Sequence, residues 1–88
     1  MHDLLNALGS IEISWLGLPD DSPLVGQTLA EANLRARTGA SIVAIMRDGV
    51  LIPNPKSITV FQMGDRVGLI GEPQQVDEVA ELIGQQPA

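Results

Sequence analysis

The side chains best equipped to hold a ligand lie in one short stretch near the middle of the chain. Arg47 ends an apolar run and stands directly before an Asp-Gly pair. Its guanidinium is a planar set of donors that matches a phosphate or a carboxylate. The same planar set of donors suits a salt bridge to Asp48 or Asp65. The sequence therefore leaves open whether Arg47 binds a ligand or forms a salt bridge within the protein.

A second candidate is the asparagine between two prolines in Pro53-Asn54-Pro55. Neither proline can donate to a strand ladder, and each restricts the residue before it, which predicts a rigid loop. The amide of Asn54 both donates and accepts hydrogen bonds and therefore suits the edge of a nucleobase. A loop that only ends a strand is the alternative.

Three apolar residues, Ile45, Met46 and Ile52, accompany these polar groups and are suited to pack on a purine ring. Apolar residues on a hairpin also commonly belong to the core or to a dimer interface. Side chains alternate along a strand, so Ile45 and Arg47 share one face while Met46 points to the other. Only one of these two sets can line a cleft.

The sequence contains no recognisable catalytic or metal-binding constellation. There is no cysteine, and the single histidine, His2, stands at the start of the chain, where a positioned base is not expected. Asp20 and Asp21 belong to a turn signal, in which such residues bond local backbone groups. Glu78 and Glu81 lie off the apolar face of a predicted helix. We therefore predict that the chain is not an enzyme and holds no metal.

Size and charge narrow the range of partners. The 88 residues include one Trp and one Phe, so the core must be aliphatic and small, and a second copy of the chain would add stability. We therefore expect a homodimer, with an apolar hairpin or helix surface at its interface. Eleven acidic against five basic residues give a net charge of −6, which opposes binding to nucleic acid.

The sequence carries no signal for membrane insertion or secretion. No apolar run approaches the ~20 residues of a membrane-spanning helix, and the first residues lack a basic and apolar leader. The absence of cysteine fits a reducing compartment. These features predict a cytoplasmic location.

The first half of the chain predicts a strand and a helix. Ile11 to Leu18 opens with period-two alternation and ends at Pro-Asp-Asp-Ser-Pro, as expected for a strand followed by a turn. Thr28 and Glu31 then form a capping-box pattern. After it, Leu29, Ala32, Asn33 and Ala36 repeat at helical spacing, which predicts a single amphipathic helix ending at Gly39.

The second half predicts three strands and a final helix. Residues 41–47 and 50–52 flank Asp48-Gly49, a signal for a two-residue hairpin turn. Residues 66–70 form a further strand, and an apolar face from Val76 to Ile83 marks a helix that starts at Pro73. The order β-α-β-β-β-α predicts an α+β fold with a small, mainly antiparallel sheet and helices packed on it. Residues 11–84 form this domain, between a linker or helical remnant at 1–10 and a tail at 85–88.

Several stretches in this order resemble the TrkA-C (RCK C-terminal) domain family. The resemblance spans roughly Ile11 to Ile83. Within the family, the sequence is most similar to the C-terminal domains of bacterial monovalent cation/proton antiporters. The segments are D-S-P-L-V-G-Q-T-L at 21–29, N-L-R-A-R-T-G-A at 33–40, V-A-I-M-R-D-G at 43–49, I-P-N-P at 52–55 and M-G-D-R-V-G-L-I-G at 63–71.

This resemblance implies a function as a ligand-sensing regulatory domain. Such a domain forms a homodimer and controls a potassium channel or a cation/proton antiporter in the same chain or as a partner subunit, at the inner face of the membrane. In some members cyclic di-AMP binds between the subunits, and this or another nucleotide is the expected ligand. The chemistry of their side chains, rather than the resemblance, predicts that it binds near Ile45, Met46, Arg47, Ile52, Pro53 and Asn54.

Two alternatives remain open at this stage. One is a dimerisation or docking domain without a ligand. The other concerns the extent of the chain, because no G-x-G-x-x-G follows a strand here, as the usual nucleotide-binding half of the regulatory unit would require. The chain is then either a piece of a larger protein or a stand-alone subunit.

Overall fold

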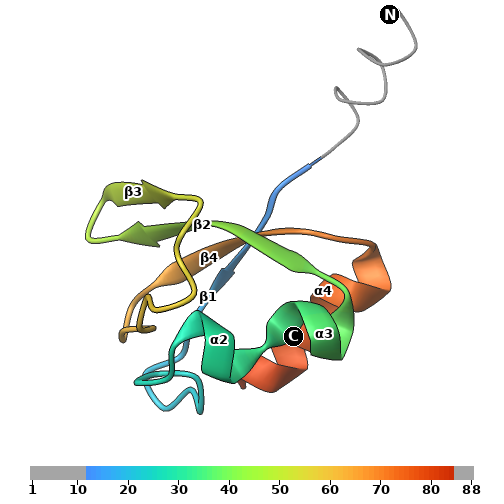
Figure 1. Cartoon of the computed structure of the whole chain (residues 1–88), viewed down its shortest axis with the longest axis horizontal. Coiled ribbons are helices and arrows are strands. Elements are labelled where there is room, and N and C mark those ends of the chain that lie inside the picture. The colour runs from blue at the N-terminus through green and yellow to red at the C-terminus, as the bar shows by residue number, and fades with distance from the viewer. Residues whose placement is uncertain (1–11, 85–88) are drawn as a thin grey trace, which may run out of the picture.

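A four-stranded sheet with helices on one of its faces forms the domain in our computed structural model (Figure 1). The structure describes residues 12–84, so the predictions for 1–10 and 85–88, His2 and Ile11 lie outside the described residues. The elements follow the predicted order, and the α+β fold class is confirmed. They are β1 (Ser14–Gly17), α2 (Leu29–Ala32), α3 (Leu34–Thr38), β2 (Ser41–Arg47), β3 (Val50–Pro53), β4 (Arg66–Ile70) and α4 (Pro73–Ile83).

The strands lie in the order β1-β4-β2-β3, and every neighbouring pair is antiparallel. The last strand in sequence, β4, is therefore inserted between β1 and β2. A register shift between Ile42 and Ala44 makes Val43 a bulge in the pairing of β2 with β4. The topology joins the first and last parts of the domain through long-range pairing.

The core lies between the sheet and the helices. Ile45 of β2 pairs with Val67 of β4, and both side chains are fully buried on the face that the helices cover. Val79 and Ile83 of α4 complete this packing and are also fully buried. The apolar face predicted for the last helix is thus confirmed as the one that packs against the core.

The predicted helix over residues 29–38 is interrupted at Asn33. Asn33 adopts the left-handed conformation, with φ 50° and ψ 44°, and its N–H donates to the carbonyl of Leu29, closing α2. Asparagine tolerates this conformation better than most residues. The break turns the next helix, so Leu34 and Thr38 are buried, whereas Ala36, predicted to lie on the apolar face, is exposed.

The hairpin and the loop after it follow from local turn chemistry. Asp48 and Gly49 both have positive φ, as a two-residue turn between right-twisted strands requires. The strand that follows extends to Pro53, one residue beyond the prediction, because β3 is an edge strand and tolerates a proline. Asn54 then turns with φ 49°, and its N–H donates to the carbonyl of Val43 over 2.8 Å.

The capping box at the start of α2 is present as predicted. The Thr28 N–H donates to Glu31 Oε1 over 2.8 Å, and the Glu31 N–H donates to Thr28 Oγ1 over 3.1 Å. The hydrogen bond from the Thr28 backbone lowers the pKa of Glu31 below its ordinary value of 4.5. The ionised Glu31 carboxylate therefore stabilises the folded domain above its ordinary pKa of 4.5, and this stabilisation is lost as the pH falls through the lowered pKa.

We therefore expect acid to weaken the wild-type domain slightly more than the Glu31→Gln variant. Glutamine keeps an oxygen that accepts the Thr28 N–H but carries no titratable charge. Thermal denaturation midpoints at neutral pH and near pH 3 measure the difference. Identical pH dependence in the two proteins would contradict the assignment of this cap.

The described residues 12–84 include no helix that is both long enough and apolar enough to span a bilayer.

Candidate ligand-binding surface

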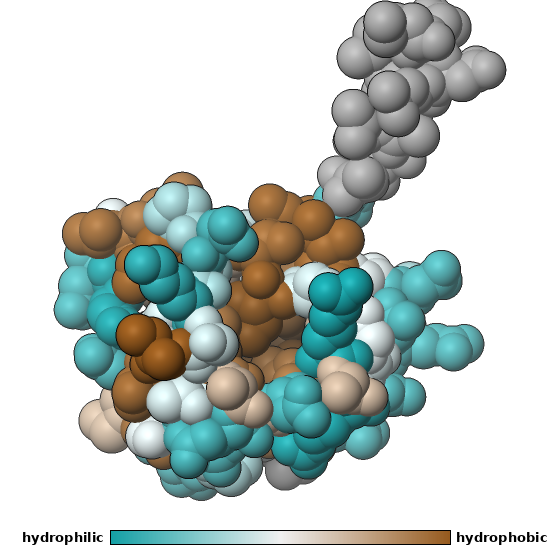
Figure 2. All heavy atoms as spheres, viewed as in Figure 1, coloured by the Kyte–Doolittle hydropathy of each residue, from teal (hydrophilic) through white to brown (hydrophobic). Residues whose placement is uncertain are grey.

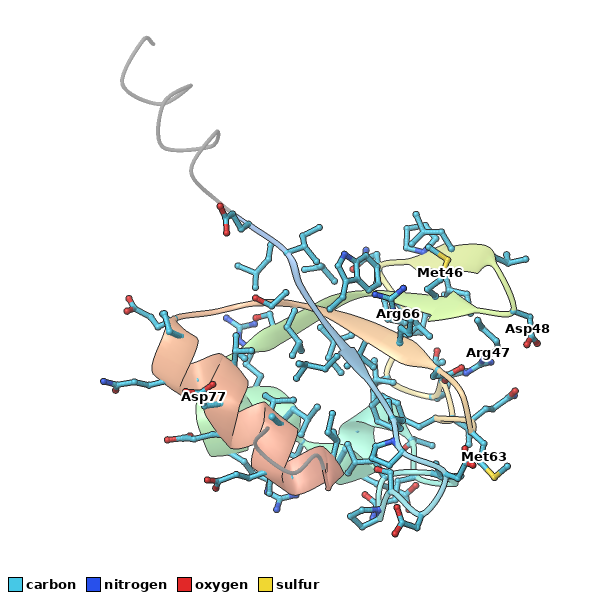
Figure 3. The ribbon with its side chains drawn as sticks, turned by 180° about the vertical axis from the view of Figure 1, so that it is seen from behind. Met46, Arg47, Asp48, Met63, Arg66 and Asp77 are labelled. Carbon is cyan, nitrogen blue, oxygen red and sulfur yellow. The ribbon has the colours of Figure 1, made fainter. Side chains whose placement is uncertain are left out.

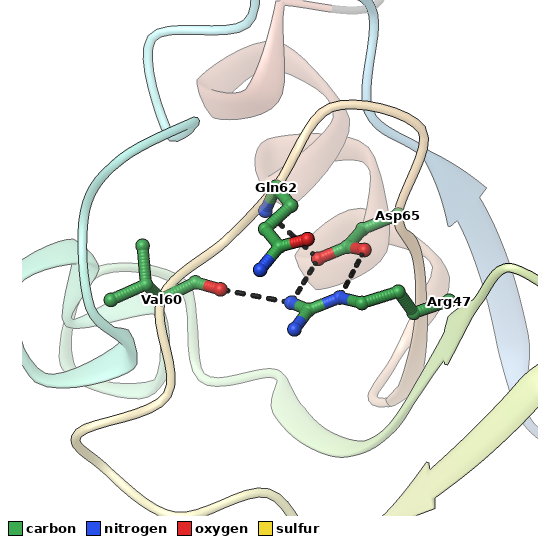
Figure 4. Close-up of polar contacts among 4 residues, drawn as sticks. All are labelled: Arg47, Val60, Gln62 and Asp65. Carbon is green, nitrogen blue, oxygen red and sulfur yellow. Dashed lines mark hydrogen bonds and ion pairs between the residues drawn. The ribbon is translucent and has the colours of Figure 1, made fainter.

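Arg47, the last residue of β2, forms a bidentate ion pair with Asp65 (Figure 4). Its Nε donates to Asp65 Oδ1 over 2.8 Å, and its Nη2 donates to Oδ2 over 2.7 Å. Nη2 also donates to the carbonyl of Val60 over 2.9 Å, and the Gln62 N–H donates to Asp65 Oδ2 over 3.0 Å. The Asp65 side chain is 0% exposed and the Arg47 side chain 22% exposed.

This arrangement supports the salt-bridge interpretation of Arg47. The hydrogen bond with Asp65 is the main reason that the pKa of Arg47 is raised, so the guanidinium is charged at neutral pH. Its Nε and Nη2 atoms are engaged inside the protein. The pair fastens the end of β2 to the loop at 60–65 and gives Arg47 a structural role.

Five of the six residues predicted to form the site lie on two different faces of the sheet, and the sixth, Asn54, follows the end of β3. Ile45, Arg47 and Ile52 point toward the helices, and Ile45 is fully buried there. Met46 and Pro53 point to the opposite face, as the pairs Met46–Leu51 and Ala44–Pro53 require. Burial thus places Ile45 in the core, so the predicted residues do not form one contiguous surface.

The sheet face turned away from the helices, the open face, carries aligned side chains from all four strands. Residues paired directly across antiparallel strands point to the same side, so the register defines two rows. Figure 3 shows Met46 and Arg66 projecting together on the side away from α4. The rows are Trp15, Gly68, Ala44 and Pro53, and Gly17, Arg66, Met46 and Leu51.

Trp15 and Arg66 are the functional candidates that the sequence analysis did not single out. The Arg66 guanidinium lies over the indole, with its carbon 6.0 Å from the ring centroid. A Cβ placed on Gly68 would lie 3.0 Å from Trp15 Cη2, so the glycine gives the indole room to lie on the sheet. The sequence did not reveal that β4 lies beside β1 and so brings Arg66 near Trp15.

The open face is mostly apolar, with the guanidinium of Arg66 and the hydroxyl of Ser41, which pairs with Ile70, as polar groups. Leu51 is 50% exposed and Ile13, whose Cγ2 lies close to Gly68, is 46% exposed. Ile70 adds a third exposed aliphatic side chain at the far end of β4. Contiguous exposed apolar surface of this kind marks interaction sites, because monomeric proteins seldom leave it uncovered.

No group of three or more His, Cys, Asp or Glu within residues 12–84 is placed to hold a metal ion. The chemistry that the open face offers is instead apolar contact, one positive charge and the amide of Asn54 at its edge. These groups suit a planar anionic ligand or a second protein surface.

The protein-family model described as "TrkA-C domain" matches residues 13–84. The chain belongs to the TrkA-C domain family. The match covers the whole of the sheet and its helices, and it confirms the family resemblance seen in the sequence.

Two curated relatives of this TrkA-C domain are named as transport proteins. "Uncharacterized transporter RB4869" of Rhodopirellula baltica is 33% identical over 64 residues, which are 73% of this chain and 12% of the relative. "Ammonium/H(+) antiporter subunit AmhM" of Alkalihalophilus pseudofirmus is 21% identical over 72 residues, or 82% of this chain and 43% of the relative. The chain therefore spans less than half of either protein.

Among solved structures, the RCK_C domain dimer of S. agalactiae BusR in complex with c-di-AMP has the same fold as this TrkA-C domain. The TM-score is 0.81 at 25% sequence identity, and the alignment covers 86% of this chain and 94% of that one. The likeness extends over almost the entire BusR domain.

Proposed function

We propose that this TrkA-C domain is a non-catalytic regulatory module that binds a small ligand and thereby controls a monovalent cation transporter. The relatives support this assignment, since one is a transporter and another is a subunit of an ammonium/proton antiporter. The regulated protein is an antiporter or a potassium channel, in the same chain or as a partner subunit. The module acts in the cytoplasm, at the inner face of the membrane.

The observation that carries the proposal is the apolar open face with a guanidinium at its centre. A second copy of the chain placed on this face covers Leu51, Ile13 and Ile70, which are exposed in the single chain. The BusR domain, with the same fold, is a dimer in complex with c-di-AMP. We therefore place the homodimer interface of this protein on the open face.

The ligand, cyclic di-AMP or a related nucleotide, binds between the two subunits. Met46 and Pro53 supply apolar contact, and Asn54, at the end of the same hairpin, supplies an amide for the base edge. Arg66 is the cation that binds the phosphate, because Arg47 forms an ion pair with Asp65 on the other face of the sheet. Ile45 and Ile52 support the hairpin from the core side.

Cyclic di-AMP is expected to bind more weakly to Arg66→Ala and to Asn54→Gly than to the wild-type domain. Loss of a charged hydrogen bond costs about 1.5–3 kcal/mol, and loss of a neutral one about 0.5–1.5 kcal/mol. Glycine at position 54 retains the positive φ of 49°, so it removes the amide without straining the loop. Isothermal titration calorimetry measures both changes.

Arg37→Ala is the control, because Arg37 is on α3 and its Nη1 donates to the carbonyl of Ala32, away from the open face. Its affinity for cyclic di-AMP should equal that of the wild type. If Arg37→Ala weakened cyclic di-AMP binding as much as Arg66→Ala does, the loss of one positive charge from the protein would explain both results, and Arg66 would have no specific role. Absence of any nucleotide response, with concentration-dependent stability, would favour a docking domain without a ligand.

A further inference from the structure

The outer edge of β3 presents backbone hydrogen-bonding groups that the sheet does not use. β3 is the last strand of the sheet, and among residues 12–84 no further strand lies beside it. The Asn54 N–H donates to the carbonyl of Val43 across the pair of β2 and β3. Hydrogen-bonded and non-bonded pairs alternate along an antiparallel ladder, so Ile52 and Val50 also bond to β2. The N–H and carbonyl of Leu51 therefore point outward.

This edge lacks most of the features that protect edge strands from pairing. Such strands usually carry charged residues, prolines or bulges that prevent the addition of another chain. β3 has the sequence Val-Leu-Ile-Pro, which is uncharged and places its proline at the last position. Val50 is 63% exposed and Leu51 50% exposed. Figure 2 shows hydrophobic side chains at the upper left, on the margin where Figure 1 places β3.

The same edge is complementary to a second copy of itself. When two β3 strands run antiparallel with Leu51 opposite Leu51, each Leu51 N–H donates to the other Leu51 carbonyl. This register sets Val50 of one chain opposite Ile52 of the other, which gives two pairs of β-branched residues on the helix-covered side.

The charges at the two ends of the strand favour this antiparallel arrangement. Asp48, which is exposed, precedes β3, and Lys56, which is also exposed, follows it. Antiparallel pairing brings the acidic end of each strand toward the basic end of the other, whereas parallel pairing would bring like charges together. The edge therefore selects another β3 strand in one direction.

We propose that two copies of the chain pair through their β3 edges, so that two four-stranded sheets become one sheet of eight strands. The pairing uses backbone groups at the side of the sheet, whereas the open-face interface uses side chains above it. Leu51 keeps its side chain on the open face in the pair, so both contacts form at once. Dimers that associate through the open face then assemble into tetramers of closed symmetry.

The edge contact is the weaker of the two interfaces. One short strand belongs with contacts that bury less than about 1,200 Å², which are typical of transient association. We therefore expect the edge pair at millimolar concentration, above the concentration at which the open-face dimer is complete. The pairing requires no ligand and does not depend on the proposed function.

Sedimentation equilibrium of the full chain from micromolar to millimolar concentration tests the proposal. The wild type should change from the mass of two chains to that of four. Val50→Lys should raise the dissociation constant of this second step on the order of tenfold, because it places a charge opposite Ile52 of the other chain. Ile58→Lys is the matched control, since Ile58 is 77% exposed in the loop after β3 and not on its edge.

NMR of a mixture of ¹³C-labelled and unlabelled chain tests the register. The closest approach in the proposed pair joins the Cα atoms of Val50 and Ile52 from different chains, so an interchain nuclear Overhauser effect should link their Hα atoms. A millimolar sample without this signal would overturn the proposal. So would the absence of a second association step, or equal dissociation constants in Val50→Lys and Ile58→Lys.

Met46→Glu separates this pairing from the open-face interface. Met46 lies on the open face, so the variant keeps an intact β3 edge and should form a pair of chains at millimolar concentration. That pair should be lost when Val50→Lys is added. Millimolar pairing of the wild type without a micromolar dimer would count against the open-face interface and leave the edge pairing supported. A Met46→Glu variant that remains a single chain at every concentration would contradict the edge pairing.

Discussion

Arg47→Ala is expected to lower the free energy of unfolding by about 3–5 kcal/mol, because it leaves a buried carboxylate without its counterion. Asp65 is 0% exposed, and after the substitution the Gln62 N–H remains as its hydrogen-bond donor in the structure. Domains of this kind have about 5–15 kcal/mol of stability in total. The variant should therefore be partly unfolded at moderate temperature.

Urea denaturation followed by the fluorescence of Trp15, the single tryptophan, measures this loss. Arg66→Ala is the matched control, since it removes a guanidinium from the open face, and it should cost less than about 1 kcal/mol. Replacing both partners, as Arg47→Met with Asp65→Leu, should recover much of the stability, because no buried charge is left unpaired. Equal denaturation midpoints for Arg47→Ala and Arg66→Ala would contradict the structural role of the ion pair.

The ion pair also changes how binding experiments are interpreted. Loss of ligand binding in Arg47→Ala would follow from unfolding alone, whether or not Arg47 contacts the ligand. Arg66, on an exposed part of β4, is the arginine whose removal tests binding without this complication.

Met46→Glu is expected to prevent dimerisation. Met46 lies in the middle of the open face, between Arg66 and Leu51, so a second copy on that face would bury the introduced carboxylate. Burial of an ion costs several kcal/mol, which corresponds to a dimer dissociation constant at least roughly a hundredfold higher. Sedimentation equilibrium should then report the mass of the single chain, 9.3 kDa, at concentrations where the wild type is a dimer.

Met63→Glu provides a matched substitution elsewhere. Met63 is exposed in the loop before β4, at a distance from Met46 in Figure 3, and its replacement should leave the dimer intact. A dimer that survives Met46→Glu and dissociates with Met63→Glu would move the interface from the open face to that loop.

Local signals in the sequence predicted most of the fold. Asp48-Gly49 marked the hairpin, Thr28 and Glu31 marked the start of a helix, and Pro73 marked the start of another. Each works through the backbone geometry of a few neighbouring residues, so each can be recognised in a sequence. The break at Asn33 escaped prediction, because helical periodicity does not reveal a single left-handed residue.

The candidate surface was less predictable because it depends on contacts between distant segments. Alternation correctly separated Met46 from Arg47 and Ile45. The order of strands was not available from the sequence, and it is the insertion of β4 that brings Arg66 beside Met46 and Trp15. Similarly, the choice of Asp65 as the partner of Arg47 depends on the path of the loop from Pro53 to β4.

Calorimetric titration of the wild-type domain with cyclic di-AMP, combined with sedimentation of the complex, tests the central claim most directly. A ligand bound between two subunits predicts one nucleotide for every two chains and a complex with twice the mass of the 9.3 kDa chain. It also predicts that the nucleotide raises the dimer's stability in proportion to the logarithm of its concentration above the dissociation constant. One nucleotide per chain on a monomer, or no heat of binding at any concentration, would contradict it.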